Sequence, residues 1–214
     1  MGALVVSLET AHESGPVLPQ MLRLRYKEFK ERQSYNIPTF KDMEYDKYDT
    51  PAAVYIVWVD GGGTVRGCSR MAPTDRDYMI RDLWPNMVTE MPLPASDEIW
   101  ESSRFCIDSA CPAQIRQQIK LEILQAKIEY SLALGIRGMI GVMPPLIWRA
   151  VFVNSGWPVD HIGPVTALET GEKVVAGWMH VNAEILSRIR SKTQLSESLL
   201  PQAQSIESLL RRVA

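Results

Sequence analysis

An apolar segment near the middle of the chain carries two charged residues, and this combination limits how the chain can fold. Residues 99–107 have the composition of a β-strand, yet Glu101 and Arg104 lie within them. A buried charge is costly unless it is paired. The segment can therefore be an internal strand only if other groups compensate both charges. The two residues belong either to a structural ion-pair network or to a site that handles a polar substrate.

The spacing of these two charges predicts an irregular strand. In a regular strand, residues three positions apart point to opposite faces of the sheet. Glu101 and Arg104 can serve one site only if the strand between them is bulged or sharply twisted. Bulges are frequent beside active sites because they redirect side chains. We therefore predict a β-bulge within residues 102–105.

The composition is that of an ordinary globular protein and disfavours several classes of function. The 214 residues suffice for one large domain or two small ones, and 46% are hydrophobic and 22% charged. A formal net charge of -2 gives no reason to expect a nucleic-acid partner. No stretch approaches the ~18 uninterrupted apolar residues of a membrane span, and the first residues lack the basic start of a secretory signal. We expect a cytoplasmic protein that binds neither nucleic acid nor membrane.

The cysteines and histidines indicate neither disulfide bonds nor a metal site. Cys68, Cys106 and Cys111 are an odd number and lack metal-ligand spacing, as expected of free thiols in the cytoplasm. The three histidines form no paired spacing either. We expect no bound metal and no cofactor.

The order of apolar runs and turn residues predicts a single α/β domain. Expected strands lie at residues 3–9, 54–59, 65–72, 99–107, 136–143, 157–162 and 174–180. Expected helices lie at residues 16–32, 112–134, 146–155, 182–192 and 205–213, with a short helical turn at 80–84. The polar stretch 33–52 is either a surface loop or a flap over a site. This alternation indicates three layers, with a mixed, twisted sheet flanked by helices.

Two further arginines lie in apolar surroundings. Arg70 belongs to the second strand of the expected hairpin, and Arg25 falls on the apolar stripe of the helix 16–32. Arg25 either pairs with an acidic residue or extends to solvent over its apolar stem. Asp46, Asp49 and Glu101 are the candidate partners.

In their order and spacing, these residues resemble one family, the acyl-homoserine lactone synthases, or LuxI-type autoinducer synthases. The matching motifs are Arg25 with Phe29, Asp46 with Asp49, Arg70, residues 82–85, and residues 100–105, which read Trp-Glu-Ser-Ser-Arg-Phe. The resemblance is close in the N-terminal half and concerns only the layout in the C-terminal half. Tyr35 stands where the family usually has Trp, and Trp84 where it usually has Phe; both keep an aromatic body.

The resemblance implies a fold similar to GNAT acyltransferases and a reaction. An acyl thioester and S-adenosylmethionine, both substrates, give an N-acyl-homoserine lactone, a free thiol carrier and methylthioadenosine. One synthase domain would span residues 1–214. Residues 1–50 would form a mobile lid that binds S-adenosylmethionine, residues 51–192 the core, and residues 193–214 a C-terminal tail or helix.

The resemblance and the chemistry of the amine together suggest a role for each candidate residue. The amine of S-adenosylmethionine must be neutral to attack, so we expect Glu101 to act as general base. Asp46, alone or with Asp49, would orient the amine or balance the sulfonium. Arg104 and Arg25 would hold the acidic cluster together, and either could meet the substrate carboxylate. A backbone N–H near Phe105 would stabilise the oxyanion. The remaining residues expected to bind substrate are Arg25, Phe29, Tyr35, Asp49, Arg70, Trp84 and Ser103, with Met143, Trp148 and Phe152 in the acyl pocket.

The acyl donor is less constrained than the reaction. Bulky pocket residues shorten a tunnel, which favours a short, branched or aromatic acyl group delivered by coenzyme A. In members of the resembled family that make 3-oxo signals, the strand after the long helix commonly ends in Ser or Thr. Residues 142–145 offer no hydroxyl, so the resemblance disfavours a 3-oxo chain. An acyl carrier protein is the alternative donor, with Arg116, Lys120 and Lys127 as its basic docking face.

Two other functions remain open at this stage. The first is a GNAT-like N-acyltransferase that never closes a lactone. The second is a non-catalytic sensor that binds an acyl ligand.

Overall fold

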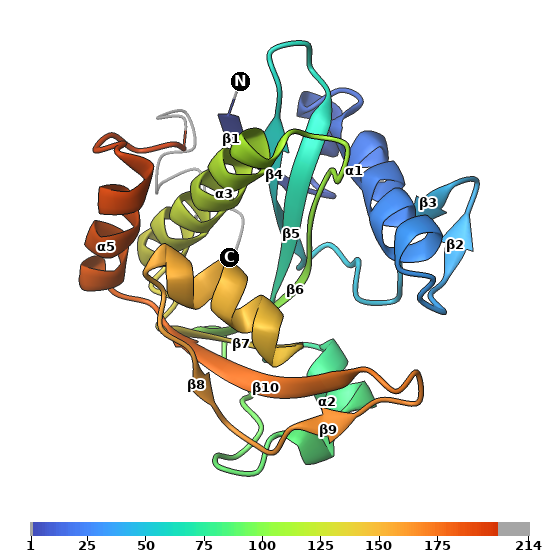
Figure 1. The fold of residues 1–214 in the computed structure, drawn as a ribbon, viewed down its shortest axis with the longest axis vertical. Coiled ribbons are helices and arrows are strands. Elements are labelled where there is room, and N and C mark those ends of the chain that lie inside the picture. The colour runs from blue at the N-terminus through green and yellow to red at the C-terminus, as the bar shows by residue number, and fades with distance from the viewer. Residues whose placement is uncertain (1, 201–214) are drawn as a thin grey trace.

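A mixed β-sheet runs through the centre of the protein and carries helices on both of its faces (Figure 1). This computed structural model describes residues 2–200. The 8-stranded sheet has the order β1-β4-β5-β6-β7-β10-β8, and β9 pairs with β10 off this path. Among the described strands of this sheet, β6 and β7 are parallel and the other pairs are antiparallel. The strands are β1 (Gly2–Ser7), β4 (Val54–Val59), β5 (Val65–Pro73), β6 (Ile99–Ile107), β7 (Gly138–Met143), β8 (Asp160–His161), β9 (Thr166–Ala167) and β10 (Lys173–His180).

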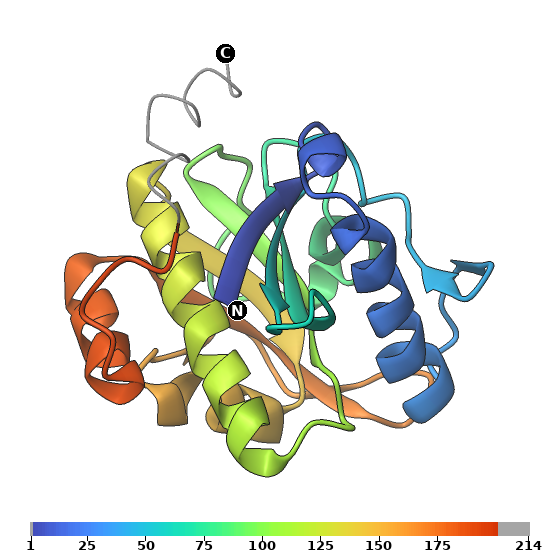
Figure 2. The same cartoon turned by 90° about the horizontal axis from the view of Figure 1, so that it is seen from above.

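Figure 2 shows that the helices α1 and α3 lie on opposite sides of the sheet, which we call the α1 face and the α3 face. On the α1 face, α1 (Val17–Arg25) continues into the π-helical η2 (Tyr26–Arg32). On the α3 face, α3 (Ala113–Ala133) packs against α5 (Ala183–Thr193). The shorter elements are η1 (Ala11–Glu13), the hairpin of β2 (Thr39–Phe40) and β3 (Met43–Glu44), α2 (Met79–Leu83), η3 (Pro85–Met87), α4 (Pro145–Ile147), η4 (Trp148–Phe152) and η5 (Val153–Ser155).

The alternation of side chains along the strands separates the cores of the two faces. In β4, Ile56 and Trp58 join the core under α3, whereas Tyr55 and Val57 join the core under α1. Gly67 in β5 allows α3 to lie directly on the sheet. A Cβ atom at this glycine would lie 2.6 Å from Cγ2 of Ile119, a distance that would force the helix outward.

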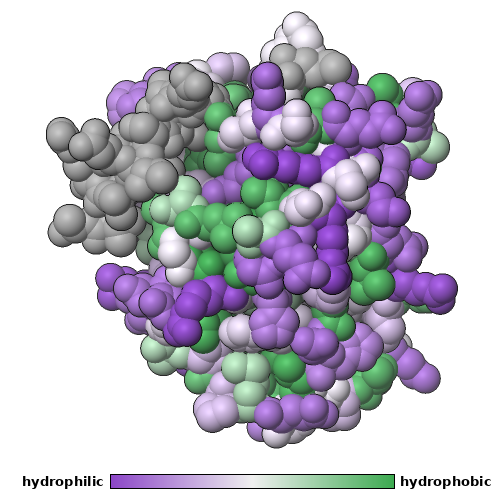
Figure 3. All heavy atoms as spheres, turned by 90° about the vertical axis from the view of Figure 1, so that its left-hand side faces the viewer, coloured by the Kyte–Doolittle hydropathy of each residue, from purple (hydrophilic) through white to green (hydrophobic). Residues whose placement is uncertain are grey.

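The last described helix is amphipathic. Asn182 caps α5, because its side-chain oxygen accepts a hydrogen bond from the N–H of Ile185 at 2.9 Å. Ile185 and Ile189 are buried, whereas Arg188 and Lys192 are exposed. On this side of the molecule hydrophilic and hydrophobic side chains are interspersed (Figure 3). Within residues 2–200, no helix is both long enough and apolar enough to cross a membrane.

The structure confirms the predicted fold class and corrects several elements. The predicted strand 157–162 is reduced to β8, since Pro158 has no N–H for a ladder and the backbone N–H of Trp157 donates to the carbonyl of Phe152 instead. The predicted helices 16–32 and 146–155 change from α-helical to π-helical geometry partway along. The stretch 33–52 contains the β2–β3 hairpin rather than only irregular chain. The predicted helix 205–213 lies outside the described residues.

The predicted bulge in β6 is present. The register against β5 shifts between Cys68 and Arg70, which pair with Cys106 and Ser103 respectively, so β6 contains one extra residue there. Arg104 adopts a left-handed conformation with φ of 53°. The extra residue lets Ser103 and Arg104 both point to the α1 face, because each makes side-chain contacts there. This explains how Glu101 and Arg104 can share one site.

Candidate active site

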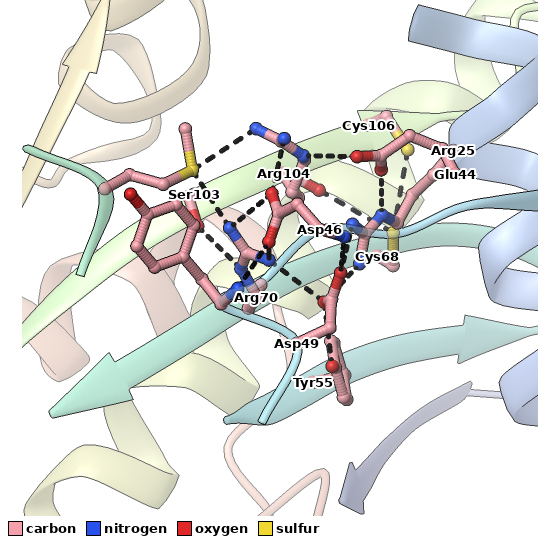
Figure 4. Close-up of polar contacts among 12 residues, drawn as sticks. Arg25, Glu44, Asp46, Asp49, Tyr55, Cys68, Arg70, Ser103, Arg104 and Cys106 are labelled. Atoms are coloured by element: carbon pink, nitrogen blue, oxygen red, sulfur yellow. Dashed lines mark hydrogen bonds and ion pairs between the residues drawn. The ribbon is translucent and has the colours of Figure 1, made fainter. Parts of the chain in front are cut away.

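Six charged side chains on the α1 face form a closed ring of alternating charge (Figure 4). Arg25 bonds Glu44 at 2.5 Å and Asp49 at 2.8 Å. Arg104 bonds the other oxygen of Glu44 at 3.1 Å and Asp46 at 2.6 Å. The ring closes through Arg70, which bonds Asp46 at 2.6 Å and Asp49 at 3.0 Å. The members come from α1, the 43–49 segment, β5 and β6, so the ring ties the N-terminal region to the sheet.

Burial varies around this ring. The side chains of Arg25, Glu44 and Arg70 are 0% exposed, whereas Asp46 is 8% and Arg104 is 14% exposed. The alternative that Arg25 extends to solvent is therefore wrong. Arg104 is the ring member that a ligand can reach most readily.

Opposite charges within the ring offset the burial of Asp49 and Arg25. Burial alone would raise the pKa of Asp49, but the hydrogen bonds and charge of Arg25, and then the charge of Arg70, hold that pKa well below its ordinary value. Burial likewise opposes the charge of Arg25, yet its carboxylate partners raise its pKa well above the ordinary value. The hydroxyl of Tyr55 donates to Asp49 at 2.8 Å.

Glu101 lies beside the ring but is held in a different way. Its side chain accepts hydrogen bonds from the N–H groups of Ile80 at 2.7 Å and Met79 at 3.2 Å, at the start of α2. Burial raises the pKa of Glu101 above its ordinary 4.5, opposed by these hydrogen bonds and by the charges of Arg70 and Arg104. A buried carboxylate with a raised pKa is suited to accept a proton near neutral pH.

Phe29 lies against Arg104, and Tyr35 stacks on Phe29. The rings of Phe29 and Tyr35 are stacked with centroids 6.3 Å apart, and the Arg104 guanidinium lies 5.9 Å from the Phe29 centroid. The Tyr35 hydroxyl donates to Glu172 at 3.0 Å, which joins the N-terminal segment to the loop before β10. Burial, with the charge of Glu172, raises the pKa of Tyr35 to about 12. Trp84 does not join this wall and packs against the cluster around Ile80 and Ile140.

The predicted acyl-pocket residues gather on the opposite, α3 face. Phe152 is buried between Trp148 and Trp157, with ring centroids 5.1 and 5.8 Å away, and Phe105 lies 6.1 Å from it. Met143 belongs to the same core. Trp148 lies against two glycines: a Cβ atom at Gly141 or at Gly177 would come within 2.9 Å of its ring. The space here is therefore filled by large rings.

The structure also places the remaining predicted residues. Ser103 accepts a hydrogen bond from Arg70 Nε at 3.0 Å, so it supports the ring. Asp46 and Asp49 lie together, because the Asp46 N–H donates to Asp49 at 2.8 Å. Within residues 2–200, no group of three or more His, Cys, Asp or Glu side chains is arranged to hold a metal ion.

Sequence reasoning missed Glu44 and misread Lys127. Glu44 bonds both Arg25 and Arg104; the clustering of acidic residues just before Asp46 was the available signal. Lys127 was expected on a basic docking face, but its side chain is fully buried. It follows Ile123 by four residues, so helical spacing places it on the buried stripe of α3.

Comparisons with known proteins agree with this geometry. The family described as Autoinducer synthase matches residues 10–189. An acyl-homoserine-lactone synthase from Ralstonia solanacearum is 34% identical over 167 residues, covering 74% of this chain and 79% of the relative. One from Pseudomonas aeruginosa is 30% identical over 172 residues, covering 78% and 84%.

Solved structures share the fold. The synthase LasI superposes with a TM-score of 0.76 at 28% identity, covering 88% of this chain and 94% of LasI. The CoA-dependent synthase BjaI, solved with MTA, gives 0.83 at 23% identity, covering 94% and 92%. A putative N-acetyltransferase from Lactobacillus plantarum gives 0.54 at 17% identity, covering 85% and 100%, which extends the likeness in fold to acetyltransferases.

The fold and the charged site thus define an acyltransferase. The chain belongs to the autoinducer synthase family, whose matching relatives are acyl-homoserine-lactone synthases.

Proposed function

We propose that this protein makes an N-acyl-homoserine lactone for quorum sensing from S-adenosylmethionine and an acyl thioester, in an acyl-transfer step followed by lactonisation. The observation that carries the proposal is the closed ring of arginines and carboxylates with Glu101 beside it. S-adenosylmethionine has an amine, a carboxylate and a sulfonium. A site with fixed charges of both signs suits such a molecule.

Acyl transfer needs a base, and Glu101 is the best-placed group. The amine attacks the thioester carbon, the new C–N bond forms, and the C–S bond to the carrier breaks. Glu101 takes the proton from the amine directly or through one water, and this proton passes to the departing thiolate, which leaves as the free thiol. The raised pKa of Glu101 supports this role, because a general base works best when its pKa lies close to the working pH.

Arg104 and Asp46, which are largely but not completely buried, orient S-adenosylmethionine. Arg104 meets the substrate carboxylate in a charge-assisted hydrogen bond. Asp46 orients the amine or balances the sulfonium from its partly exposed side. Phe29 and Tyr35 close over the substrate from the N-terminal region.

The second step requires no further catalytic group. The substrate carboxylate attacks the carbon beside the sulfonium, the C–O bond forms and the C–S bond breaks, and methylthioadenosine leaves. The site contributes by holding the chain in a ring-forming pose. The related synthase TofI, 27% identical with a TM-score of 0.74 over 88% of this chain and 96% of TofI, has been solved with MTA, which supports such a product here.

The bulge supplies the oxyanion donor. A β-bulge leaves a backbone group unpaired in the ladder, and the extra residue lies next to Phe105. An N–H there stabilises the negative oxygen of the tetrahedral intermediate.

The aromatic cluster favours a small acyl group carried by coenzyme A. Phe105, Trp148 and Phe152 fill the space where a long chain would have to lie. A short, branched or aryl acyl group therefore fits better than a long one. The burial of Lys127 also removes one cation from the face expected to dock a carrier protein.

Mass spectrometry of the products tests both parts of the proposal. The protein is incubated with S-adenosylmethionine and a panel of acyl-coenzyme A and acyl-carrier-protein thioesters. We expect an acyl-homoserine lactone and methylthioadenosine in equal amounts, with the highest turnover for a short acyl-coenzyme A.

Other outcomes identify the competing functions. Acylated product without methylthioadenosine would indicate a simple N-acyltransferase. No thioester consumption with any donor would indicate an acyl-ligand sensor. Faster turnover with a long-chain acyl carrier protein would reject the proposed donor while keeping the reaction.

A further inference from the structure

A lysine side chain is buried in the core on the α3 face, directly behind the active site. Lys127 is 0% exposed. Its Nζ lies 2.5 Å from Ser102 Oγ and 3.1 Å from Ser69 Oγ. The rings of Phe152 and Trp157 lie on its other sides, with centroids 5.7 and 6.0 Å away.

Packing alone does not account for this residue. Within residues 2–200, its hydrogen-bond partners are two serine hydroxyls, and burial lowers its pKa to about 7. A methionine would fill the same space without burying an amine, and apolar replacements of buried charges are often neutral or stabilising. The lysine therefore weakens the core unless its hydrogen bonds serve another purpose.

The two serines identify that purpose, because they flank the bulge. Ser69 is the β5 residue that has no pairing partner in β6, at the point where the register shifts. Ser102 immediately precedes Ser103 and the left-handed Arg104. Lys127 Nζ thus bridges the two strands on the α3 face at the point where the bulge interrupts the ladder.

The bulge needs support from both faces. A left-handed conformation is strained at a residue other than glycine, and such strain persists only where the surroundings hold it in place. On the α1 face, Arg104 is held by Glu44 and Asp46. On the α3 face, Lys127 holds the adjoining backbone through Ser69 and Ser102.

We propose that Lys127 is a positioning residue, which holds the β6 bulge from behind and thereby fixes the directions of Glu101, Arg104 and the Phe105 N–H. The effect on catalysis rests on the proposed function. Glu101 adjoins Ser102, so any relaxation of the bulge moves the base directly. Small misplacements of reacting groups cost about 10²-fold in rate.

The test compares Lys127→Met with Lys192→Met, a matched substitution of an exposed lysine on α5. Hydrogen exchange of the 100–107 backbone reports on the bulge without requiring activity. We expect faster exchange in Lys127→Met, a melting temperature no lower than that of the parent, and wild-type exchange in Lys192→Met. The turnover number per folded molecule should fall about 10–100-fold in Lys127→Met, with KM for S-adenosylmethionine nearly unchanged.

Two further variants keep the test decisive if Lys127→Met does not fold. Ser102→Ala and Ser69→Ala each remove one partner of the amine with little change in volume. Each should accelerate exchange at the bulge, and the Lys127→Met/Ser102→Ala double variant should be no worse than Lys127→Met alone.

Unchanged exchange at residues 100–107 in these variants would overturn the proposal, and so would faster exchange with wild-type turnover. Failure of the proposed function is distinguishable. In that case the parent protein itself produces no lactone, and the exchange measurement alone decides whether Lys127 holds the bulge.

Discussion

The two faces of β6 hold buried cations in opposite ways. On the α1 face, Arg25 is fully buried and its carboxylate partners raise its pKa well above the ordinary value. On the α3 face, Lys127 is equally buried, but its partners are serine hydroxyls and its pKa falls to about 7. Burial is the same on both faces, so the partners decide whether the charge is kept.

This difference assigns separate tasks to the two faces. The ring on the α1 face retains full charges and can therefore bind a charged substrate. On the α3 face, the amine of Lys127 lies among aromatic rings and burial lowers its pKa to about 7. The bulge at residues 102–105 joins the two environments.

The largest expected effect is the loss of the base on the α1 face. Glu101→Gln should lower turnover by about 10²–10⁴-fold, since the amide cannot take the proton. The variant should still fold, because one side-chain oxygen remains to accept a backbone N–H from α2. Steady-state kinetics with circular dichroism measures both properties.

The exposed Glu98→Gln provides the matched control, because Glu98 pairs only at the surface with Arg137. It should retain normal turnover. Near-normal turnover in folded Glu101→Gln would reject the assignment of the base.

Breaking the ring should unfold the protein more readily. Arg25→Ala leaves the fully buried Glu44 and the largely buried Asp49 without one of their cations, and losing one partner of a buried pair costs about 3–5 kcal/mol. Urea denaturation measures the free energy of unfolding. Arg23→Ala, an exposed arginine on the same helix, should change it little. Equal effects of the two substitutions would show that the ring does not stabilise the fold.

The contrast between the faces also explains what the sequence could reveal. The bulge was predictable because Glu101 and Arg104 would point to opposite faces of a regular strand and could not share a site there. The ring was predictable in part, since Arg25 and Arg70 stood out as charges in apolar patterns. The place of Glu44 in the ring was not predictable, because Glu44 reaches the ring through the β2–β3 hairpin, which the local sequence pattern does not specify.

The α3 face was harder to anticipate. Lys127 lies on the apolar stripe of α3, but lysines commonly extend from such stripes to solvent. Its burial results from the approach of α3 to Gly67 and from the aromatic cluster above it, both of which are tertiary features. Periodicity therefore gave the position of the residue on the helix but not its environment.

The pH dependence should separate activity from the stability of the ring. Because burial raises the pKa of Glu101, its basic form is lost as the pH falls through a value above the ordinary 4.5. Asp49 has a lowered pKa, so its stabilisation is present above the ordinary 3.8 and is lost only as the pH falls below that value. Turnover should therefore decline on acidification before Asp49 ceases to stabilise the fold.

Rate and melting temperature measured over the same pH series would check this order. The series should be repeated in Lys127→Met, because Lys127 also titrates near pH 7. Simultaneous loss of rate and of folded protein would contradict the separation.

The smallest expected effect concerns the aromatic wall that covers the ring. Tyr35→Phe removes the hydrogen bond from the hydroxyl to Glu172 but keeps the ring that stacks on Phe29. One such hydrogen bond contributes about 0.5–1.5 kcal/mol. If the wall closes over S-adenosylmethionine, KM for that substrate should rise by a few-fold while the turnover number stays nearly constant.

Tyr45→Phe is the control, since Tyr45 is exposed and belongs to the same N-terminal region. A fall in turnover number without a change in KM would mean that Tyr35 acts on the reacting atoms rather than on closure. No change in either parameter would mean that the contact with Glu172 only links the N-terminal region to the loop before β10 and does not affect substrate binding. The site would then be defined by the ring, Glu101 and the bulge alone.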